Sequence, residues 1–181
     1  MSAILLRMVK SISNLSEYFE HELKDAYDAE TLLVDALGTL AREAADPEVK
    51  QAFESHREET RGHVARLEEV FTIFGKEPNR GEGCDGIRGI LEEKKKLGRH
   101  DPAPPILQMA NLTGAAKTER YEISVYESLI QLATELGLDD VVEILEQTLD
   151  EEEAALETVL GFAESELPAE TTRATPSRNA R

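Results

Sequence analysis

A repeat of two long segments at a constant offset of 92 residues is the feature that most constrains the fold of this chain. Residues 27–63 align with residues 119–155. The aligned pairs include Glu30 with Glu122, Val49 with Val141, Phe53 with Leu145, and Glu59 with Glu151. In each segment, apolar residues recur at helical spacing on both sides of one short break. The repeat predicts two pairs of helices, and the short linkers make the helices of each pair antiparallel neighbours.

Capping residues, prolines and glycines predict where these helices begin and end. The first helix is expected to begin at the N-cap Asn14, with Glu17 as a capping-box partner, and to end near residues 42–45. The second begins at Asp46 and Pro47 and ends at Gly75. The remaining expected helices are a short one at 86–97, a third long one at about 106–136 and a fourth from 139 to about 166.

The long crossover with its own short helix is typical of ferritin-like connectivity. The predicted fold class is therefore all-α: a ferritin-like antiparallel four-helix bundle with a short extra helix in the crossover between helices 2 and 3. We expect the bundle to span 14–166, after an N-terminal extension at 1–13. The tail at 167–181 is rich in Thr, Pro and Arg without any period, which predicts disorder.

Composition narrows the function. The net charge of −17 repels phosphate backbones, so we expect no nucleic-acid partner. A metal site needs only about six ligating groups, so most of the 37 acidic residues must form a solvated surface, as in proteins adapted to high salt. No apolar run approaches the roughly 20 residues that span a bilayer, so no membrane association is expected. The single Cys84 cannot form an internal disulfide, which favours a cytoplasmic location.

Charged residues on otherwise apolar helix stripes are candidate metal ligands, because a buried carboxylate needs a proton, a partner or a cation. At a rise of about 1.5 Å per residue, the candidates lie at one level of the bundle. The candidates are Glu30, His56, Glu59, Glu119, Glu122, Glu151 and Glu152. Carboxylates with imidazole suit iron or manganese, so the layer predicts a di-iron or di-manganese site.

Simpler roles are open for several of these residues. The acidic run at 150–153 is typical of a solvated face, and His56 could be a hydrogen-bonded core histidine. His63, two turns beyond His56, fits either role. The tyrosines that could hydrogen-bond ligating carboxylates, or simply pack in the core, are Tyr27, Tyr121 and Tyr126.

Four stretches together resemble the YciE/YciF-type stress-protein family, a ferritin-like group of unknown function. They are HELKDAYDAE (21–30), AFESHREETRGHVARLEEVF (52–71), KTERYEISVYESL (117–129) and LGLDDVVEILEQTLDEEEAAL (136–156). The position of Cys84 before a short helix also fits. The resemblance implies a ferritin-like bundle, a homodimer and a di-metal centre, and it implies no established reaction.

The chain departs from the Glu-x-x-His pattern of ferritins and rubrerythrins. The third residue after Glu59 is Gly62, and the third after Glu151 is Ala154. The expected site is therefore rich in carboxylates and lacks one standard histidine. No Cys-x-x-Cys module for rubrerythrin-type electron delivery is present.

Two hypotheses follow from the sequence. The first is a stress-associated protein with a dinuclear iron or manganese site that handles oxygen or peroxide. The alternative is a metal-free dimeric helical bundle that acts through protein–protein interaction. The sequence assigns no catalytic residue and does not decide whether the protein is an enzyme.

Overall fold

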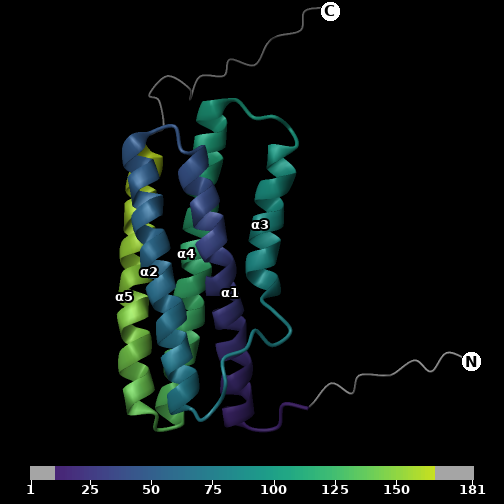
Figure 1. The fold of residues 1–181 in the computed structure, drawn as a ribbon, viewed down its shortest axis with the longest axis vertical. Helices are drawn as coiled ribbons and strands as arrows, with labels where there is room; N and C mark the ends of the chain where they lie inside the picture. Colours follow the sequence, from purple (N-terminus) through teal and green to yellow (C-terminus); the bar gives the residue numbers. More distant parts are fainter. Residues whose placement is uncertain (1–10, 166–181) are drawn as a thin grey trace, which may run out of the picture.

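The computed structural model describes residues 11–165, and this part of the chain contains five α-helices and no strand. The helices are α1 (Leu15–Glu43), α2 (Pro47–Ile73), α3 (Asp85–Gly98), α4 (Pro104–Glu135) and α5 (Asp139–Ser165). Four of them form a long bundle and α3 stands beside it (Figure 1). The prediction of an all-α bundle with a short helix in the crossover is confirmed.

Two antiparallel hairpins build the bundle, as the repeat predicts. The α1–α2 hairpin turns at residues 44–46, and the α4–α5 hairpin turns at 136–138, where Gly137 adopts a left-handed φ of 69°. Across the hairpins, α1 packs against α4 and α2 packs against α5. The crossover at residues 74–103 returns the chain along the length of the bundle, so that α4 runs antiparallel to α1 (Figure 1).

The helix ends agree with the capping predictions at most positions. The side chain of Asn14 accepts a hydrogen bond from the Glu17 amide, and Asp46 accepts from the Glu48 and Val49 amides. Two boundaries differ from expectation: α3 begins at Asp85, and α4 begins at Pro104, two residues early. Proline is tolerated in the first helical turn, where its missing N–H has no intrahelical partner in any case.

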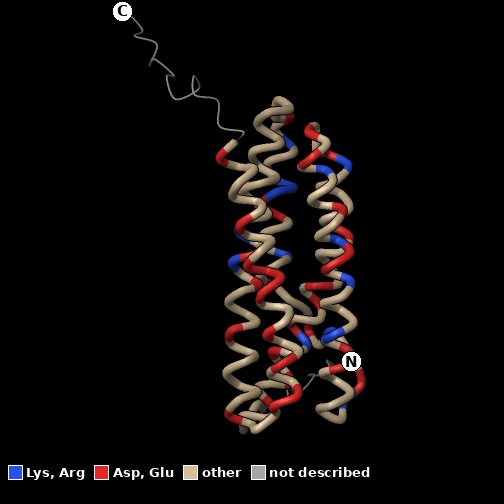
Figure 2. Tube along the Cα trace, turned by 90° about the vertical axis from the view of Figure 1, so that its left-hand side faces the viewer, with Lys and Arg blue, Asp and Glu red and all other residues tan. Residues whose placement is uncertain are grey.

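Acidic residues are distributed along the length of the bundle (Figure 2). Inside, two apolar clusters fill the ends. One surrounds Phe19, Phe71 and Leu145 near the α4–α5 turn, and the other surrounds Leu40, Phe53 and Leu112 near the α1–α2 turn. Six buried polar side chains separate the two clusters: Glu30, His56, His63, Glu119, Glu122 and Glu152. We call these six side chains the polar layer, and the candidate site lies within it.

The inner faces of α4 and α5 differ slightly from the sequence prediction. Glu122, which was expected at the flank of its stripe, is buried, whereas Ile123 is only partly buried. On α5, Thr148 and Ala155 are buried, and the expected Leu149 and Leu156 are only partly buried. The reason is that α5 packs against both α2 and α4, and α4 packs against α1, α3 and α5, so the buried face of each helix is wider than a single stripe.

The lower end of α3 is fixed to the bundle by apolar packing and one ion pair. Cys84 and Ile87 pack against Ala29 and Leu33 of α1. Asp28 accepts a hydrogen bond from the Cys84 amide at 2.8 Å and pairs with Arg88 at 2.7 Å. These contacts hold the crossover beside the polar layer.

Gly86→Ala is expected to destabilise the protein by about 1–3 kcal/mol, as overpacking of a fitted contact does. A Cβ at Gly86 would lie 2.5 Å from Cζ of Tyr121, which is held by contacts to Cys84 and Asp25. Gly89→Ala on the same helix is the matched control, because no atom lies within 4 Å of its added Cβ. Urea unfolding measures both variants. Equal stabilities would show that α3 is not fitted against Tyr121.

No helix in residues 11–165 has the length and apolarity needed to cross a bilayer. The expected tail at 167–181 and most of the expected extension at 1–13 lie outside the described residues. The domain boundaries stay predictions.

Candidate metal centre

Four glutamates from three helices meet in the polar layer with almost no exposure to solvent. Glu30 of α1, Glu119 and Glu122 of α4, and Glu152 of α5 are 1%, 1%, 3% and 1% exposed. Each lies on a helix face that is otherwise apolar, so the bundle that buries the leucines also buries these carboxylates. Four acidic groups in one dry volume are unstable unless cations or protons compensate them.

Two histidines of α2 enter the same layer, and each forms a group with two carboxylates. His63 Nδ1 lies 3.3 Å from Glu30 Oε1 and 2.9 Å from Glu152 Oε1. His56 Nε2 lies 3.3 Å from Glu119 Oε2 and 3.7 Å from Glu152 Oε2. Glu152 belongs to both groups, with one oxygen toward each histidine. The two imidazole rings are 6.3 Å apart.

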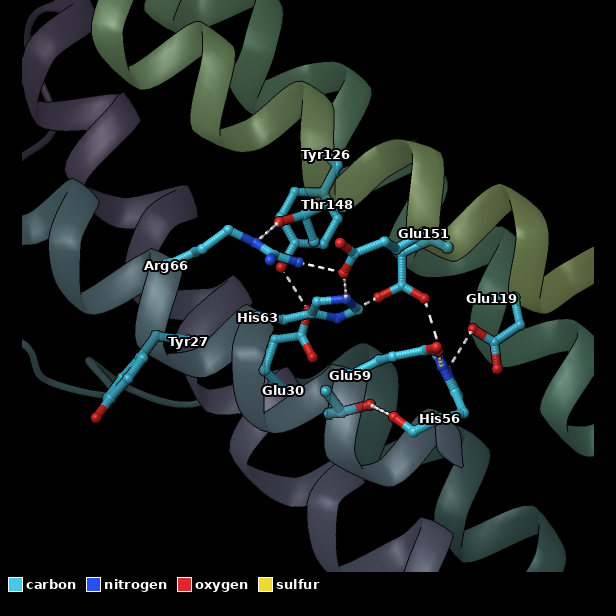
Figure 3. Close-up of polar contacts among 12 residues, drawn as sticks. Tyr27, Glu30, His56, Glu59, His63, Arg66, Glu119, Tyr126, Thr148 and Glu151 are labelled. Atoms are coloured by element: carbon cyan, nitrogen blue, oxygen red, sulfur yellow. Dashed lines mark hydrogen bonds and ion pairs between the residues drawn. The ribbon is translucent and has the colours of Figure 1, made fainter. Parts of the chain in front are cut away.

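The other ring nitrogen of each histidine points outward and contacts a further glutamate nearer the surface. His56 Nδ1 lies 3.3 Å from Glu59, and His63 Nε2 lies 3.0 Å from Glu151 (Figure 3). Arg66 pairs with Glu151 and donates a hydrogen bond to Thr148 at 2.8 Å. A carboxylate behind a histidine fixes the ring orientation and the tautomer, as it does for metal-ligating histidines. Glu59 and Glu151 therefore orient the two rings.

Several inward-facing atoms of the layer lack a hydrogen bond. Glu119 Oε2 and the two oxygens of Glu152 face histidine nitrogens in the ion pairs described above, whereas Glu30 Oε2 and Glu122 Oε1 have neither a hydrogen bond nor an ion pair. The other Glu30 oxygen accepts a hydrogen bond from the hydroxyl group of Tyr126. Buried polar atoms without partners are rare in folded proteins. The donor set of carboxylate oxygens and imidazole nitrogens fits a hard or borderline divalent cation.

Burial raises the pKa of Glu30, Glu122 and Glu152, and neighbouring carboxylates raise that of Glu122 further. Burial alone would lower the pKa of the histidines, but the surrounding carboxylates outweigh it. The pKa of His56 is raised to about 11 and that of His63 to about 10. At the surface side, the hydrogen bond from His56 lowers the pKa of Glu59.

The charges of the layer do not balance within the protein. Two protonated histidines can offset only two of the four buried carboxylates, so the remainder must bind protons or cations. Two divalent ions would balance all four carboxylates and leave both histidines neutral, which is the form that binds metal. The residues present therefore allow a two-ion site.

The structure places most of the candidates predicted from sequence in one layer. Glu30, His56, Glu119, Glu122 and Glu152 converge in the centre. The side chains of Glu59 and Glu151 are 51% and 31% exposed and lie behind the histidines rather than among the central carboxylates.

The sequence does not decide the role of His63, and the structure buries this side chain completely between Glu30 and Glu152. Its spacing of seven residues from His56 was the available signal, since seven residues are two helical turns on one face. Of the three candidate tyrosines, Tyr126 alone contacts a central carboxylate. Tyr27 points away and donates a hydrogen bond to Glu68 (Figure 3), and Tyr121 contacts Cys84 and Asp25.

Comparison with known proteins agrees with this fold. The family described as "Domain of unknown function (DUF892)" matches residues 14–172. Protein YciF of Escherichia coli K12 is 32% identical over 144 residues, covering 80% of this chain and 87% of YciF. The crystal structure of the E. coli stress protein YciF superposes with a TM-score of 0.81 at 30% identity, covering 86% of this chain and 98% of that one.

Two further structures extend the comparison. YcfI from Rhodopseudomonas palustris has a TM-score of 0.81 at 33% identity, over 84% of this chain and 97% of that chain. A ferritin-like diiron-carboxylate protein from Bacillus anthracis has a TM-score of 0.62 at 18% identity, over 84% and 99% of the two chains, and it supports the fold alone. The chain belongs to the DUF892 family of YciE/YciF-type ferritin-like proteins.

Proposed function

We propose that this protein binds two iron or manganese ions in the polar layer and uses them to handle oxygen or peroxide. The observation that carries the proposal is that two histidines can offset only part of the charge of four buried glutamates. Metal ions can replace the protons that would otherwise be needed to neutralise the remaining charge. Four-helix bundles of the ferritin-like type bind metal at this position, between facing helices.

Each residue of the layer has a separate role in this proposal. Glu30 and His63 hold one ion, and Glu119 and His56 hold the other. Glu152 lies between the two groups and is shared, with Glu122 facing it from α4. Glu59 and Glu151 orient the histidines, and Tyr126 orients Glu30. Bound iron or manganese would supply the redox chemistry toward oxygen or peroxide.

A small opening on the α2–α5 side gives reactants a route to this layer. A pocket of about 210 Å³ is lined by His56, Glu59 and Glu151, and by apolar residues that include Phe53 and Val159. An opening of this size suits a diatomic molecule or peroxide, because small-molecule sites for larger ligands are roughly 300–1,000 Å³. The proposed reactants fit the opening.

Metal content tests the proposal. Protein without an affinity tag, purified without chelator, is expected to contain about two iron or manganese ions per chain by mass spectrometry of the metals. Glu122→Gln should weaken binding of Fe(II) and Mn(II), because the amide removes one charge and one oxygen donor. Glu127→Gln is the matched control, since Glu127 is exposed on the same helix. Consumption of peroxide by Fe(II)-loaded protein under argon tests the reaction.

Sub-stoichiometric metal that is removed by washing, with equal affinities in the two variants, would contradict the metal centre. That outcome would favour the alternative of a metal-free bundle that acts through protein contacts. Two tightly bound ions without peroxide consumption would support the metal site but contradict the proposed reaction with peroxide. The homodimer stays a prediction, and sedimentation equilibrium measures it.

A further inference from the structure

We propose that divalent metal ions enter the polar layer through the pocket between α2 and α5, with Glu59 as their first contact, and that the position beside Glu119 fills before the position beside Glu30. This proposal rests on the metal centre proposed above, because it concerns how ions reach that centre. The six side chains of the polar layer are at most 9% exposed, so an ion in solvent needs a route through the surface to reach them.

Two routes of contacting side chains lead from the surface to the layer. In the Glu59 route, the side chain of Glu59 is 51% exposed and contacts His56 Nδ1 at 3.3 Å, and His56 Nε2 faces Glu119 at 3.3 Å. In the Glu151 route, the side chain of Glu151 is 31% exposed and contacts His63 Nε2 at 3.0 Å. Carboxylate oxygens and imidazole nitrogens, which bind iron and manganese, follow one another along both routes. An ion can therefore exchange its water molecules for protein ligands in steps.

Arg66 closes the Glu151 route to cations. It pairs with Glu151 and donates a hydrogen bond to Thr148 at 2.8 Å, which holds the guanidinium group against the carboxylate. Gln147 donates a further hydrogen bond to Glu151 at 3.1 Å. Within residues 11–165, by contrast, Glu59 pairs with no lysine or arginine. A guanidinium group repels divalent cations, so the Glu59 route is the one that admits them.

The pocket between α2 and α5 gives the Glu59 route an open approach. Its volume is about 210 Å³, and the ionisable residues that line it within the described chain are His56, Glu59 and Glu151. A larger pocket of about 580 Å³, between α1, α3 and α4, also reaches the layer, at Glu119. Its lining is mainly apolar, and its two lysines offset two of its three carboxylates. A hydrated cation is therefore favoured in the α2–α5 pocket, whose lining includes two carboxylates and neither lysine nor arginine.

The shared Glu152 connects the end of the Glu59 route to the second ion position. Its Oε2 faces His56 at 3.7 Å, and its Oε1 faces His63 at 2.9 Å. An ion that arrives beside His56 therefore meets a carboxylate that also reaches the second position. The position beside Glu119 is expected to fill first, and the position beside Glu30 is expected to fill from it.

Stopped-flow uptake of Mn(II) by metal-free protein tests the route, at about 0.15 M salt, where the Debye length is about 8 Å. Glu59→Gln should slow association about tenfold, the lower end of what local charge contributes to association rates. Glu58→Gln is the matched control, because Glu58 is the neighbouring residue of α2, is exposed, and does not line the pocket. The control removes the same charge and should keep an association rate close to that of the wild type.

Dissociation rates separate this role of Glu59 from its orientation of His56. Loss of orientation alone raises the dissociation rate and leaves association unchanged, because the bound ion is held less well. A narrower route slows both rates equally and leaves the affinity unchanged, since ions leave by the route through which they enter. Ala154→Leu narrows the pocket and should slow both rates. Ala65→Leu, at an exposed position of α2 outside the pocket, should change neither rate.

A second substitution tests whether Arg66 closes the Glu151 route. Added to Glu59→Gln, Arg66→Gln should restore fast association, because it opens the second route. Arg61→Gln in the same background is the matched control, since Arg61 is exposed on α2 and pairs with Glu58 outside the pocket. Equal association rates in the two double variants would contradict the role of Arg66.

The order of filling is tested with one ligand removed from each position. Glu30→Gln should bind one ion at the wild-type rate, whereas Glu119→Gln should bind its remaining ion slowly. Faster uptake by Glu119→Gln than by Glu30→Gln, or loss of both ions from Glu30→Gln, would contradict this order.

Failure of the route and failure of the metal centre give different results. Absence of bound Mn(II) from the wild-type protein at equilibrium would contradict the metal centre, and the route with it. Bound Mn(II), together with wild-type association rates in Glu59→Gln and Ala154→Leu, would overturn the route alone. Gly114→Leu fills the larger pocket, because no atom lies within 4 Å of a Cβ built on Gly114. Slow uptake in this variant, with fast uptake in Ala154→Leu, would place the entry between α1, α3 and α4 and overturn the proposal.

Discussion

Glu152→Gln is expected to abolish binding of both metal ions, the largest functional loss from any single substitution in the bundle. Glu152 directs Oε1 to His63 at 2.9 Å and Oε2 to His56 at 3.7 Å, so both proposed ion positions depend on it. Glutamine keeps the shape but removes the charge and one of the two oxygen donors. The loss should exceed the 10–100-fold that residues behind the ligands contribute.

Mn(II) titration, followed through the electron paramagnetic resonance signal of free Mn(II), measures this loss. Glu153→Gln is the control, because Glu153 is the exposed neighbour of Glu152 on α5. The control should retain about two ions per chain, as expected for a di-metal bundle. Retention of both ions by Glu152→Gln would remove Glu152 from the site, and retention of one ion would show that the two groups bind independently.

The metal-free protein is expected to lose stability as pH rises, and added metal should restore it. Burial raises the pKa of Glu30, Glu122 and Glu152 above the value in the unfolded chain. Their stabilising contribution is fully present below the unfolded pKa and is lost as pH rises through the folded pKa. A divalent ion replaces the lost protons.

The histidines act in the same direction at higher pH. The folded pKa is about 11 for His56 and about 10 for His63, both raised from 6.5. Their contribution is fully present below pH 6.5 and is lost as pH rises toward these values. Glu59 and Glu151 have lowered pKa values and lose their contribution on acidification, below the usual carboxylate pKa. From mildly acidic to alkaline pH, the groups with raised pKa values therefore determine how the stability of the metal-free protein changes.

Thermal unfolding at several pH values, with and without Mn(II), measures this effect at high salt, which screens the acidic surface. Metal at 100 times its dissociation constant should add about 2.7 kcal/mol, or roughly 5–10 °C for a chain of this size. Glu122→Gln should be more stable than the wild type when metal-free at pH 8 and should gain less from metal. A melting temperature independent of both pH and metal would contradict the raised pKa values of the glutamates and the metal site.

The repeat predicted the helix pairs and the level of the site, because both follow from spacing along helices. The repeat could not distinguish a glutamate in the centre of the bundle from a glutamate that lies on the outer side of a histidine. The repeat aligns Glu59 with Glu151, and the structure gives both the same place, outside a histidine. The same offset aligns the central Glu152 with Thr60, which carries no charge. The two halves of the repeat therefore differ at the residue that contacts both histidines.

The role of His63 could not be decided from the sequence for a related reason. A buried histidine on an apolar stripe has the same pattern whether it binds a backbone group or faces carboxylates. Its contacts with Glu30 and Glu152 come from α1 and α5, two helices distant in sequence from each other.

Anomalous diffraction at the iron and manganese absorption edges, from crystals of metal-loaded protein, tests the two-ion centre most directly. Two peaks are expected inside the bundle, one beside Glu30 and His63 and one beside Glu119 and His56, with Glu152 between them. A single peak, peaks confined to the acidic surface, or no peak at the polar layer would contradict a dinuclear centre in this bundle.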